Sequence, residues 1–499
     1  MNKAAKTILA LLVAISLFQT NTKDISAFTR APPDSYNPQV ARDNNGGSYI
    51  AFTEQTLKNI LIQHIDDLGK PEWTVTVGTC LDNYHFKIFS DTDGNAFVIW
   101  HGNSNDISGV YAQKFDSQGR NLWKDTGVLI QNQDFNSFDW LEDVTATTDG
   151  NGGAIVVSET RSGTGSIYVQ RIDREGEIVW DSQNNRITNN ANQGVECITD
   201  GDGGAIISWQ DLNIPRASFA VRINSNGKAS WDNGQVNGQV NIGYDEYHTT
   251  LLSDGRHGAI IFFYDFPNHS MLHIDETGNT TWKIENLSQL LGTNGSSNFY
   301  MTPDGVGGVI MSYHDAKNYM SANIFADLYA SKLDAAGELD WTIPLGTAYY
   351  LSRPQAIPSG NDSFTVAWEN VISGKRHIYL QKINLLGDAF WREGGLDIGR
   401  IYDPERRFQI VPNAHSGIIL IGEEGDIDTP LLYSLSIDKT GVVTQYKDAL
   451  YPSGAKRTYK DYEYPNIFGF IAIVVLGVFI TVLAVIVYVI DRIIKFLKK

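Results

Sequence analysis

The chain has 499 residues and a formal net charge of −18, with 42% hydrophobic residues, 46 glycines and 2 cysteines. Its 11 tryptophans and 23 tyrosines exclude a disordered or collagen-like chain, and the low cysteine content excludes a scaffold built on disulfides. The acidic balance argues against a nucleic-acid partner, because such binding needs clustered Lys and Arg.

The first 27 residues have the layout of a secretory signal peptide. Lys3 and Lys6 precede an apolar run from Ile8 to Phe18, and a polar stretch follows it. The run is shorter than the roughly 20 residues that span a bilayer. We therefore predict a signal peptide over residues 1–27, with an uncleaved N-terminal anchor as the alternative.

Residues 28–450 carry a pattern that repeats about every 50 residues. Its signature is a glycine followed four residues later by tryptophan, with Asp or Asn three residues before the glycine. The glycines are Gly69, Gly119, Gly176, Gly227, Gly278, Gly337, Gly387 and, in a last copy without the tryptophan, Gly441. An Asx side chain caps a tight turn and Gly supplies the positive φ that ends it, so each copy predicts a hairpin.

A second hairpin signal lies upstream in each repeat. It is clearest in the Asp-Gly-x-Gly-Gly segments that begin at Asp149 and Asp200, each followed by an apolar strand, whereas Ser359 and Asn413 replace the Asp in the last two repeats. Each repeat thus predicts four antiparallel strands, the fourth ending at the tryptophan. The first strands are expected near Gln39, Phe86, Val144, Val195, Thr250, Phe299, Gln355 and Gln409.

Four strands in about 45–50 residues, repeated radially, suit a β-propeller blade, because closure of the ring protects the strand edges. The predicted fold class is all-β, an eight-bladed β-propeller of four-stranded antiparallel blades, plus one C-terminal transmembrane helix. The tryptophans are expected to pack between neighbouring blades. A linear β-solenoid is the competing architecture, but its rungs are usually shorter and lack paired hairpins.

The end of the chain predicts a membrane anchor. Ile467 to Ile490 contains no charged residue and is long enough to span a bilayer. Basic residues outnumber acidic ones in the tail 491–499, which is therefore expected to be cytoplasmic, and residues 451–466 are expected to form a juxtamembrane linker. The predicted localisation is the cell membrane, as a single-pass type I protein whose bulk is extracellular or periplasmic.

The repeat resembles known protein families. The segments from Tyr168 to Trp180 and from Asp200 to Trp209 are similar to tandem repeats of secreted and surface β-propeller proteins of bacteria and archaea, over about residues 36–447. The Gly-x-x-x-Trp ending also resembles the docking motif of eight-bladed quinoprotein dehydrogenases and of a related outer-membrane assembly lipoprotein. That motif has one more residue between its Asp and Gly than the segment from Asp334 to Gly337 has.

Enzyme and metal motifs are weak in this sequence. The quinoprotein resemblance would imply an adjacent cysteine pair, but Cys80 and Cys197 are far apart and are expected to be free, buried thiols. Sialidases carry an arginine cluster, whereas Arg171 and Arg222 fall in the repeat's strand pattern. Calcium-loop fragments at Asp91 and Asp200 lack the later bidentate acid and are interpreted as turn residues. We expect no cofactor, no metal and no catalytic residues.

Four acidic residues form the one candidate binding site. Asp139, Glu142 and Asp143 lead into the first strand of the third repeat, and Glu196 lies in that of the fourth. Neighbouring blades would bring them to one mouth of a central channel. This acidic rim, defined as these four residues, is a hypothetical site for a cation or a basic partner segment, and the alternative is that they are solvated acids on an acidic protein.

The predicted function is a non-enzymatic, membrane-anchored binding or adhesion module whose partner is an extracytoplasmic protein or glycan. Variable loops between the second and third strands, at residues 103–108, 159–166, 212–218 and 314–325, are expected to carry recognition. One alternative is a glycan-acting propeller hydrolase or lyase, which needs two carboxylates flanking a groove. The other is an envelope-assembly scaffold.

Overall fold

The computed structural model describes residues 35–445, apart from short gaps. The gaps are 55–57, 82–85, 105–106, 133–139, 162–164, 181–185, 189–191, 212–216, 232–237, 245–246, 265–268, 294–298, 316–324, 350–353, 361, 373–374, 401–407 and 425–430. The predicted signal peptide, linker, membrane span and tail all lie outside the described residues. Within the described part of the chain, no helix is long and apolar enough to cross a membrane.

The chain is all-β and its strands follow the predicted order of four per repeat. The first strands are β1 (Ser35–Arg42), β5 (Phe86–Ser90), β9 (Trp140–Thr148), β13 (Asn192–Thr199), β17 (Tyr247–Ser253), β21 (Phe299–Pro303), β25 (Gln355–Pro358) and β29 (Gln409–Pro412). The second strands are β2 (Ser48–Glu54), β6 (Ala96–Ser104), β10 (Ala154–Arg161), β14 (Ala205–Asp211), β18 (Ala259–Tyr264), β22 (Val309–Asp315), β26 (Ser363–Ile372) and β30 (Ile418–Glu424). Every predicted first-strand position is confirmed.

The remaining strands complete each repeat. The third strands are β3 (Asn59–Ile65), β7 (Ile107–Phe115), β11 (Ser166–Ile172), β15 (Ala217–Ile223), β19 (Ser270–Ile274), β23 (Phe325–Leu333), β27 (Lys375–Asn384) and β31 (Leu431–Ile437). The fourth strands are β4 (Pro71–Cys80), β8 (Val128–Asn132), β12 (Arg186–Thr188), β16 (Val240–Tyr244), β20 (Thr280–Ile284), β24 (Leu339–Tyr349), β28 (Leu396–Arg400) and β32 (Val443–Gln445). A short helix, α2 (Leu287–Leu290), follows β20.

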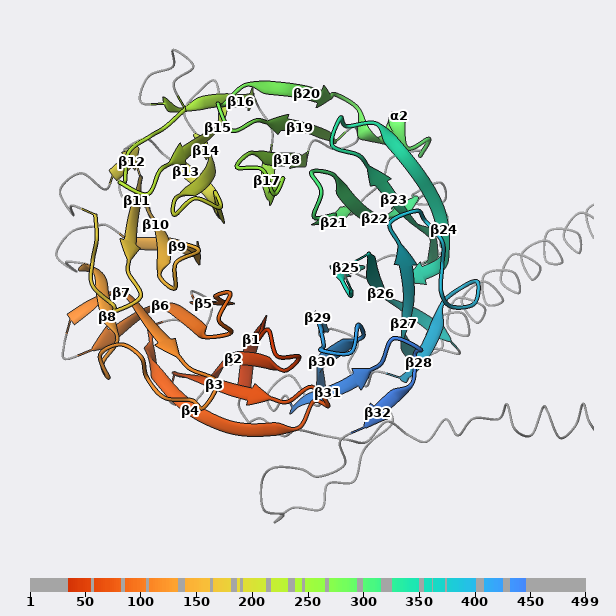
Figure 1. Ribbon diagram of the computed structural model, residues 1–499, viewed down its shortest axis with the longest axis horizontal. Helices are drawn as coiled ribbons and strands as arrows, with labels where there is room; N and C mark the ends of the chain where they lie inside the picture. Colours follow the sequence, from red (N-terminus) through yellow and green to blue (C-terminus); the bar gives the residue numbers. More distant parts are fainter. Residues whose placement is uncertain are drawn as a thin grey trace, which may run out of the picture.

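The sheets are arranged radially, with the first strands innermost and the fourth strands outermost (Figure 1). Six sheets contain four strands each, and β1–β8 form one eight-stranded sheet because the end of β4 pairs with β6. Each first strand contacts the next, and β29 contacts β1. The last repeat therefore lies against the first, as a propeller requires.

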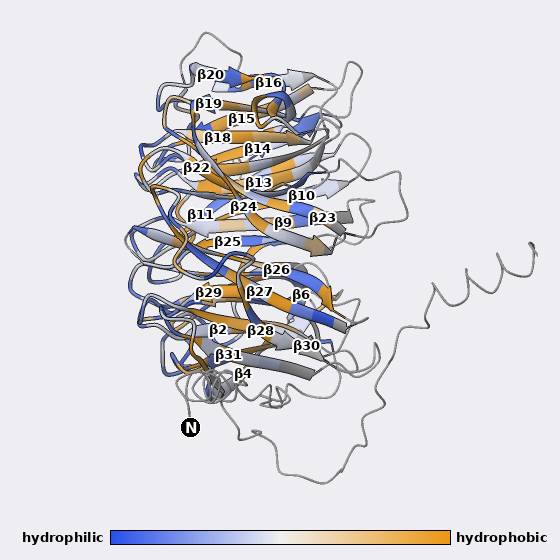
Figure 2. Cartoon of the chain, turned by 90° about the vertical axis from the view of Figure 1, so that its right-hand side faces the viewer, coloured by the Kyte–Doolittle hydropathy of each residue, from blue (hydrophilic) through white to orange (hydrophobic). Residues whose placement is uncertain are grey.

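Hydrophobic residues are concentrated in the strands (Figure 2), and the buried clusters that form the core join residues of neighbouring sheets. Phe97 of the second repeat, for example, packs in one buried cluster with Val144 of the third. The cluster that contains Ile50 and Ile419 joins the first repeat to the last. Each sheet thus buries both faces. For this reason the strands contain runs of consecutive apolar residues, and apolar and polar residues do not simply alternate along them.

The repeated tryptophans pack between neighbouring sheets, as predicted. The indole of Trp123 lies against Gly176 of the next repeat, and its Nε1 donates a hydrogen bond to the Arg174 carbonyl at 3.1 Å. The prediction that the fourth strand ends at the tryptophan is wrong. Trp123 precedes β8. The residues between the turn and β8 pair with the third strand only through a single bridge, between Phe115 and Asn121, so they form no strand.

Two further sequence predictions need correction. The sequence predicts a long loop at residues 103–108, but Asn103 pairs with Ser108 and Ser104 with Ile107, so these four residues belong to β6 and β7. Both cysteines are free, as predicted, but only Cys80 is buried and Cys197 is half-buried. The reason is position: Cys197 lies on a first strand at the inside of the ring, and Cys80 lies in the core beside Trp100.

Candidate functional site

The turns between the first and second strands lie at one end of the sheets, which we call the hairpin end. A side chain in the turn stabilises it, as Asp149 shows. The Oδ1 atom of Asp149 accepts hydrogen bonds from the backbone N–H groups of Asn151 and Gly153, at 2.8 and 2.7 Å. Its Oδ2 atom lies 2.9 Å from the Arg171 guanidinium of the third strand. The carboxylate thus holds both the turn and the neighbouring strand, which leaves it engaged within its own sheet.

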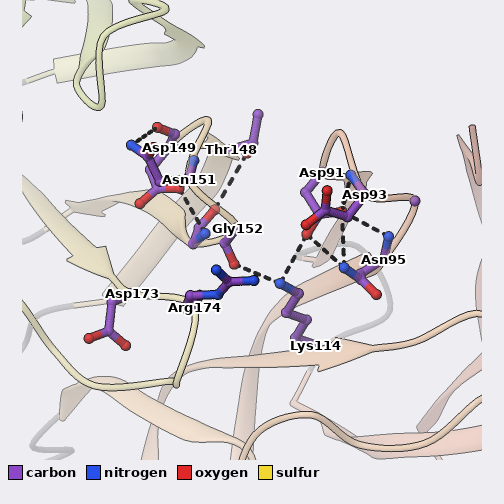
Figure 3. Close-up of polar contacts among 12 residues, drawn as sticks. Asp91, Asp93, Asn95, Lys114, Thr148, Asp149, Asn151, Gly152, Asp173 and Arg174 are labelled. Carbon is purple, nitrogen blue, oxygen red and sulfur yellow. Dashed lines mark hydrogen bonds and ion pairs between the residues drawn. The ribbon is translucent and has the colours of Figure 1, made fainter.

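The same pairing recurs with different basic side chains of the third strand. Asp200 pairs with Arg222, Asp91 with Lys114, and Asp254 with His273, each at 2.9 Å. Lys114 also donates to the Gly152 carbonyl of the next repeat (Figure 3). Arg171 and Arg222, interpreted from sequence as strand residues, are therefore partners of the turn carboxylates.

The opposite end of the sheets differs from repeat to repeat. We number each repeat from the turn residue between its first and second strands, which is Asp or Asn except for Ser359, and call it the turn Asx. The residues ten positions after it are Thr53, His101, Glu159, Gln210, Tyr264, His314, Glu369 and Glu423. Glu159 and His314 are fully buried, and burial lowers the pKa of His314 to about 4, so this imidazole is neutral at neutral pH. Burial raises the pKa of Glu369, although Arg376 lies 2.8 Å away and opposes the shift.

The structure places part of the predicted acidic rim at this end. Asp139 lies outside the described residues, and Glu142 lies in β9, where only its backbone is described. Asp143, also in β9, is half-buried and its Oδ1 accepts from the Val144 N–H at 2.8 Å. Glu196, half-buried in β13, accepts a hydrogen bond from the Leu251 N–H of β17 at 2.6 Å.

Asp143 and Glu196 interact electrostatically across neighbouring sheets. Burial raises the pKa of Glu196 to about 7; the Leu251 N–H and the charge of Lys87 oppose this shift, and the charge of Asp143 adds to it. A carboxyl that changes charge near neutral pH is typical of functional sites, although structural ion pairs also produce such shifts.

Glu159 is an acidic residue that sequence reasoning missed. It is directly opposite Asp143 in the β9–β10 register, so the two carboxyl side chains share one face of the sheet. The available signal was a glutamate two positions after the apolar run 154–157, inside the strand Ala154–Arg161. We call Asp143, Glu159 and Glu196 the carboxylate cluster. Among the described residues, no group of three or more His, Cys, Asp and Glu side chains is arranged to hold a metal ion.

Comparison with known proteins finds distantly similar solved structures but no similar sequence. No protein-family model and no curated protein sequence matches it. Similar solved structures include a eukaryotic initiation factor, with 8% identity, a TM-score of 0.42 and coverage of 84% of this chain and 89% of that one. The β-propeller domain of the Trilobed protease from Pyrococcus furiosus has 9% identity, a TM-score of 0.41 and coverage of 72% and 99%. Polysaccharide lyase Uly1 has 11% identity, a TM-score of 0.37 and coverage of 83% and 93%.

By its own sheet topology and radial arrangement, the chain is an all-β, propeller-like protein with many four-stranded antiparallel sheets. The resemblance to tandem-repeat surface proteins stays a prediction.

Proposed function

We propose that the chain is an eight-bladed β-propeller, anchored in the membrane, that binds an extracytoplasmic ligand at the end of the sheets opposite the hairpins. The blade count follows from dividing the eight-stranded sheet into two, since β4 and β6 pair at only two positions, Thr79 with Asn103 and Cys80 with Gly102. The exported location follows from the sequence of residues 1–27 and 467–490.

The observation that carries this proposal is the difference between the two ends of the repeats. At the hairpin end, carboxylates such as Asp149 and Asp200 are occupied by third-strand cations. At the other end, equivalent positions hold chemically different residues, among them His101, Glu159 and His314. Residues that vary on a repeated scaffold can recognise a specific partner without disturbing the fold.

The position of Asp143 favours a basic partner segment, because this half-buried carboxyl group can contact the partner, whereas Glu159 is fully buried and can act on it only electrostatically. Asp143 and Glu159 share one face of a sheet, and Asp143 also acts on Glu196. The chain as a whole carries a formal net charge of −18, which steers cationic partners toward it. We therefore propose a protein ligand with clustered Lys and Arg.

Neutralising the cluster should weaken binding of such a ligand. The double variant Asp143→Asn with Glu159→Gln keeps the side-chain shapes and removes up to two charges, and we expect about tenfold weaker binding and a weaker salt dependence. The measurement is capture of basic envelope proteins by the full chain, followed by titration of the captured protein at two salt concentrations.

The matched control is Asp173→Asn, at an Asx turn where Asn serves equally in other repeats, as Asn224 shows. This control also removes one charge, but at the hairpin end, and should leave binding unchanged. Equal weakening by both variants would mean that net charge alone attracts the partner. Binding that survives the double variant in full would contradict the proposed site.

One observation favours a second candidate, a glycan-acting hydrolase or lyase. Asp143 and Glu159 are a carboxyl pair on one face of a sheet, and glycosidases act through two carboxyl groups. Release of reducing ends or unsaturated sugars by the wild-type chain, lost in the double variant, would support this candidate over the binding module. The envelope-assembly scaffold stays a prediction.

The proposed anchor has its own test. The full chain should stay with the membrane during extraction at alkaline pH, because a span of this length inserts stably. A variant ending at Pro465 should appear in the soluble fraction with the same circular dichroism spectrum in the far ultraviolet. Release of the full chain by alkaline extraction would contradict a spanning helix.

A further inference from the structure

Side chains on the first strands make another contact between neighbouring sheets, in addition to that of the tryptophans. The residue that makes it lies four positions before the turn Asx. The residues at this position are Gln39, Lys87, Thr145, Glu196, Thr250, Tyr300, Gln355 and Gln409. The Nε2 atom of Gln39 donates to the Phe86 carbonyl of the next first strand at 2.7 Å. Gln409 does the same to the Pro38 carbonyl at 2.7 Å, which links the last repeat to the first.

Gln355 shows the full form of this contact. Its Nε2 donates to the Phe408 carbonyl of β29, and its Oε1 accepts from the Ile410 N–H at 3.1 Å. The amide therefore supplies a donor and an acceptor to two backbone groups on the neighbouring strand. This pairing needs both functions in one side chain, which a glutamine provides at every pH.

Glu196 occupies the equivalent position in the fourth repeat. Its Oε2 accepts from the Leu251 N–H at 2.6 Å, as Gln355 accepts from Ile410. Leu251 and Ile410 are equivalent, each three positions before its turn Asx, so the residue equivalent to Phe408 is Thr249. An ionised carboxylate has no proton to donate to the Thr249 carbonyl, whereas a protonated carboxyl has one.

We propose that Glu196 is a protonation-dependent latch between β13 and β17. In the protonated form, one carboxyl oxygen accepts from the Leu251 N–H and the O–H donates to the Thr249 carbonyl, which reproduces the glutamine contact. In the ionised form only the first bond remains, and a negative charge faces a carbonyl oxygen. The latch therefore holds the two first strands together more firmly at acidic pH than at alkaline pH.

The surroundings of Glu196 set its pKa within the pH range in which the protein can be measured. Burial raises its pKa to about 7, against an ordinary value of 4.5. Lys87 on β5 favours the ionised form and Asp143 on β9 favours the protonated form. The other charged groups described on strands that pack against β13 are Glu159 on β10 and Asp211 on β14, and the described side chains of β17 carry no charge.

The sign of the effect follows from linkage. The pKa is higher in the folded chain than in the unfolded chain, so the folded chain binds more protons between about pH 4.5 and about pH 7. Stability therefore falls as the pH rises through this range. The contribution of Glu196 is fully present below the unfolded value and is lost above the folded one.

The test compares the full chain with Glu196→Gln, an isosteric change that supplies the donor at every pH. The urea midpoints of the two proteins should agree at about pH 5, and the midpoint of the variant should be higher at about pH 8. Carboxyl groups that do not interact with Glu196 titrate equally in both proteins, so the difference between them isolates Glu196 together with its interaction with Asp143. A difference that stays the same at both pH values would overturn the proposal.

Two further measurements test the proposal, one at an equivalent position and one by spectroscopy. In Gln355→Glu, which alters the contact between β25 and β29, the urea midpoint should acquire a pH dependence of the same sign. A variant whose midpoint shows no new pH dependence would count against the latch. Infrared difference spectra of the full chain should show a protonated carboxyl band that disappears from about pH 6 to about pH 8 and is missing in Glu196→Gln. A wild-type chain without this band at about pH 6 would rule the protonated latch out.

Discussion

Replacing Lys114 by Met is expected to lower the free energy of unfolding by about 3–5 kcal/mol, because it leaves the Asp91 carboxylate buried without its counter-ion. The two side chains are 4% and 1% exposed, and Lys114 Nζ lies 2.9 Å from Asp91 Oδ2. The same ammonium donates to the Gly152 carbonyl at 2.7 Å and lies over the Phe97 ring. One substitution thus weakens a turn and the contact with the next sheet together.

The pH dependence of this effect has a definite sign. Burial alone would raise the pKa of Asp91, but hydrogen bonds from Asn95 and Lys114 outweigh it and hold the pKa below the ordinary 3.8. The stabilisation is therefore present above that value and is lost as the pH falls through the lower, folded value. The difference in the free energy of unfolding between the wild-type chain and Lys114→Met should become smaller at strongly acidic pH.

Arg120→Met is the matched control. Arg120 also pairs with an aspartate of its own repeat, Asp116, at 2.7 Å, but its side chain is 77% exposed. A solvent-screened pair of this kind contributes about 0–1 kcal/mol. Urea unfolding followed by tryptophan fluorescence measures both variants. If both lost the same small amount, the buried pair would not be the stabilising contact that its geometry indicates.

The repeat architecture is predictable from sequence because its signals are local. Asx and Gly at fixed spacing determine the hairpins, so the strand order follows without knowledge of the tertiary structure. Asn413 illustrates this, since its Oδ1 accepts from the N–H groups of His415 and Gly417 at 3.0 and 2.9 Å, as an Asp would.

The second role of the turn aspartates is harder to predict. Their partners on the third strand are His64, Lys114, Arg171, Arg222, His273 and Lys332. These residues all have basic side chains but differ in identity, so a search for one repeated residue type does not find them. In the seventh repeat Ser359 replaces the aspartate, and Lys382 instead donates to the Ser416 carbonyl at 2.5 Å.

The candidate site was predictable only in part. Radial order alone indicates that Asp143 and Glu196 lie on neighbouring inner strands, and the structure shows that they interact electrostatically. Glu159 depends on the β9–β10 register, which a bulge shifts beside it, so its place opposite Asp143 needs tertiary information. The role of Glu196 as a counterpart of Gln355 likewise depends on the contact between sheets.

Trp123→Ala is the second large expected effect, a loss of about 3–5 kcal/mol in the free energy of unfolding. The side chain is 6% exposed and packs with Phe97 at a ring-centroid distance of 5.4 Å. It also donates to the Arg174 carbonyl of the next repeat. Truncation therefore opens a cavity between two sheets and leaves a carbonyl without its donor, and thermal unfolding followed by circular dichroism measures the loss.

A double-mutant cycle with Gly176 separates packing from backbone strain. Gly176 has φ +87°, and an added Cβ would lie 2.7 Å from the Trp123 ring. Gly176→Ala alone should therefore suffer both a steric clash and the cost of a left-handed backbone, which is about 1–2 kcal/mol. In the Trp123→Ala background the indole ring is absent. The loss in the free energy of unfolding caused by Gly176→Ala should then fall to the cost of the left-handed backbone.

Gly150 supplies the reference for that backbone term. It has φ +74°, and no atom lies within 4 Å of an added Cβ. Gly150→Ala should therefore cost the same about 1–2 kcal/mol in the wild-type and the Trp123→Ala backgrounds. Because Gly176 and Trp123 belong to different repeats, coupling confined to that pair would show that the two residues touch across neighbouring sheets in solution. Additive losses at Gly176 would show instead that the indole and the glycine do not touch in solution.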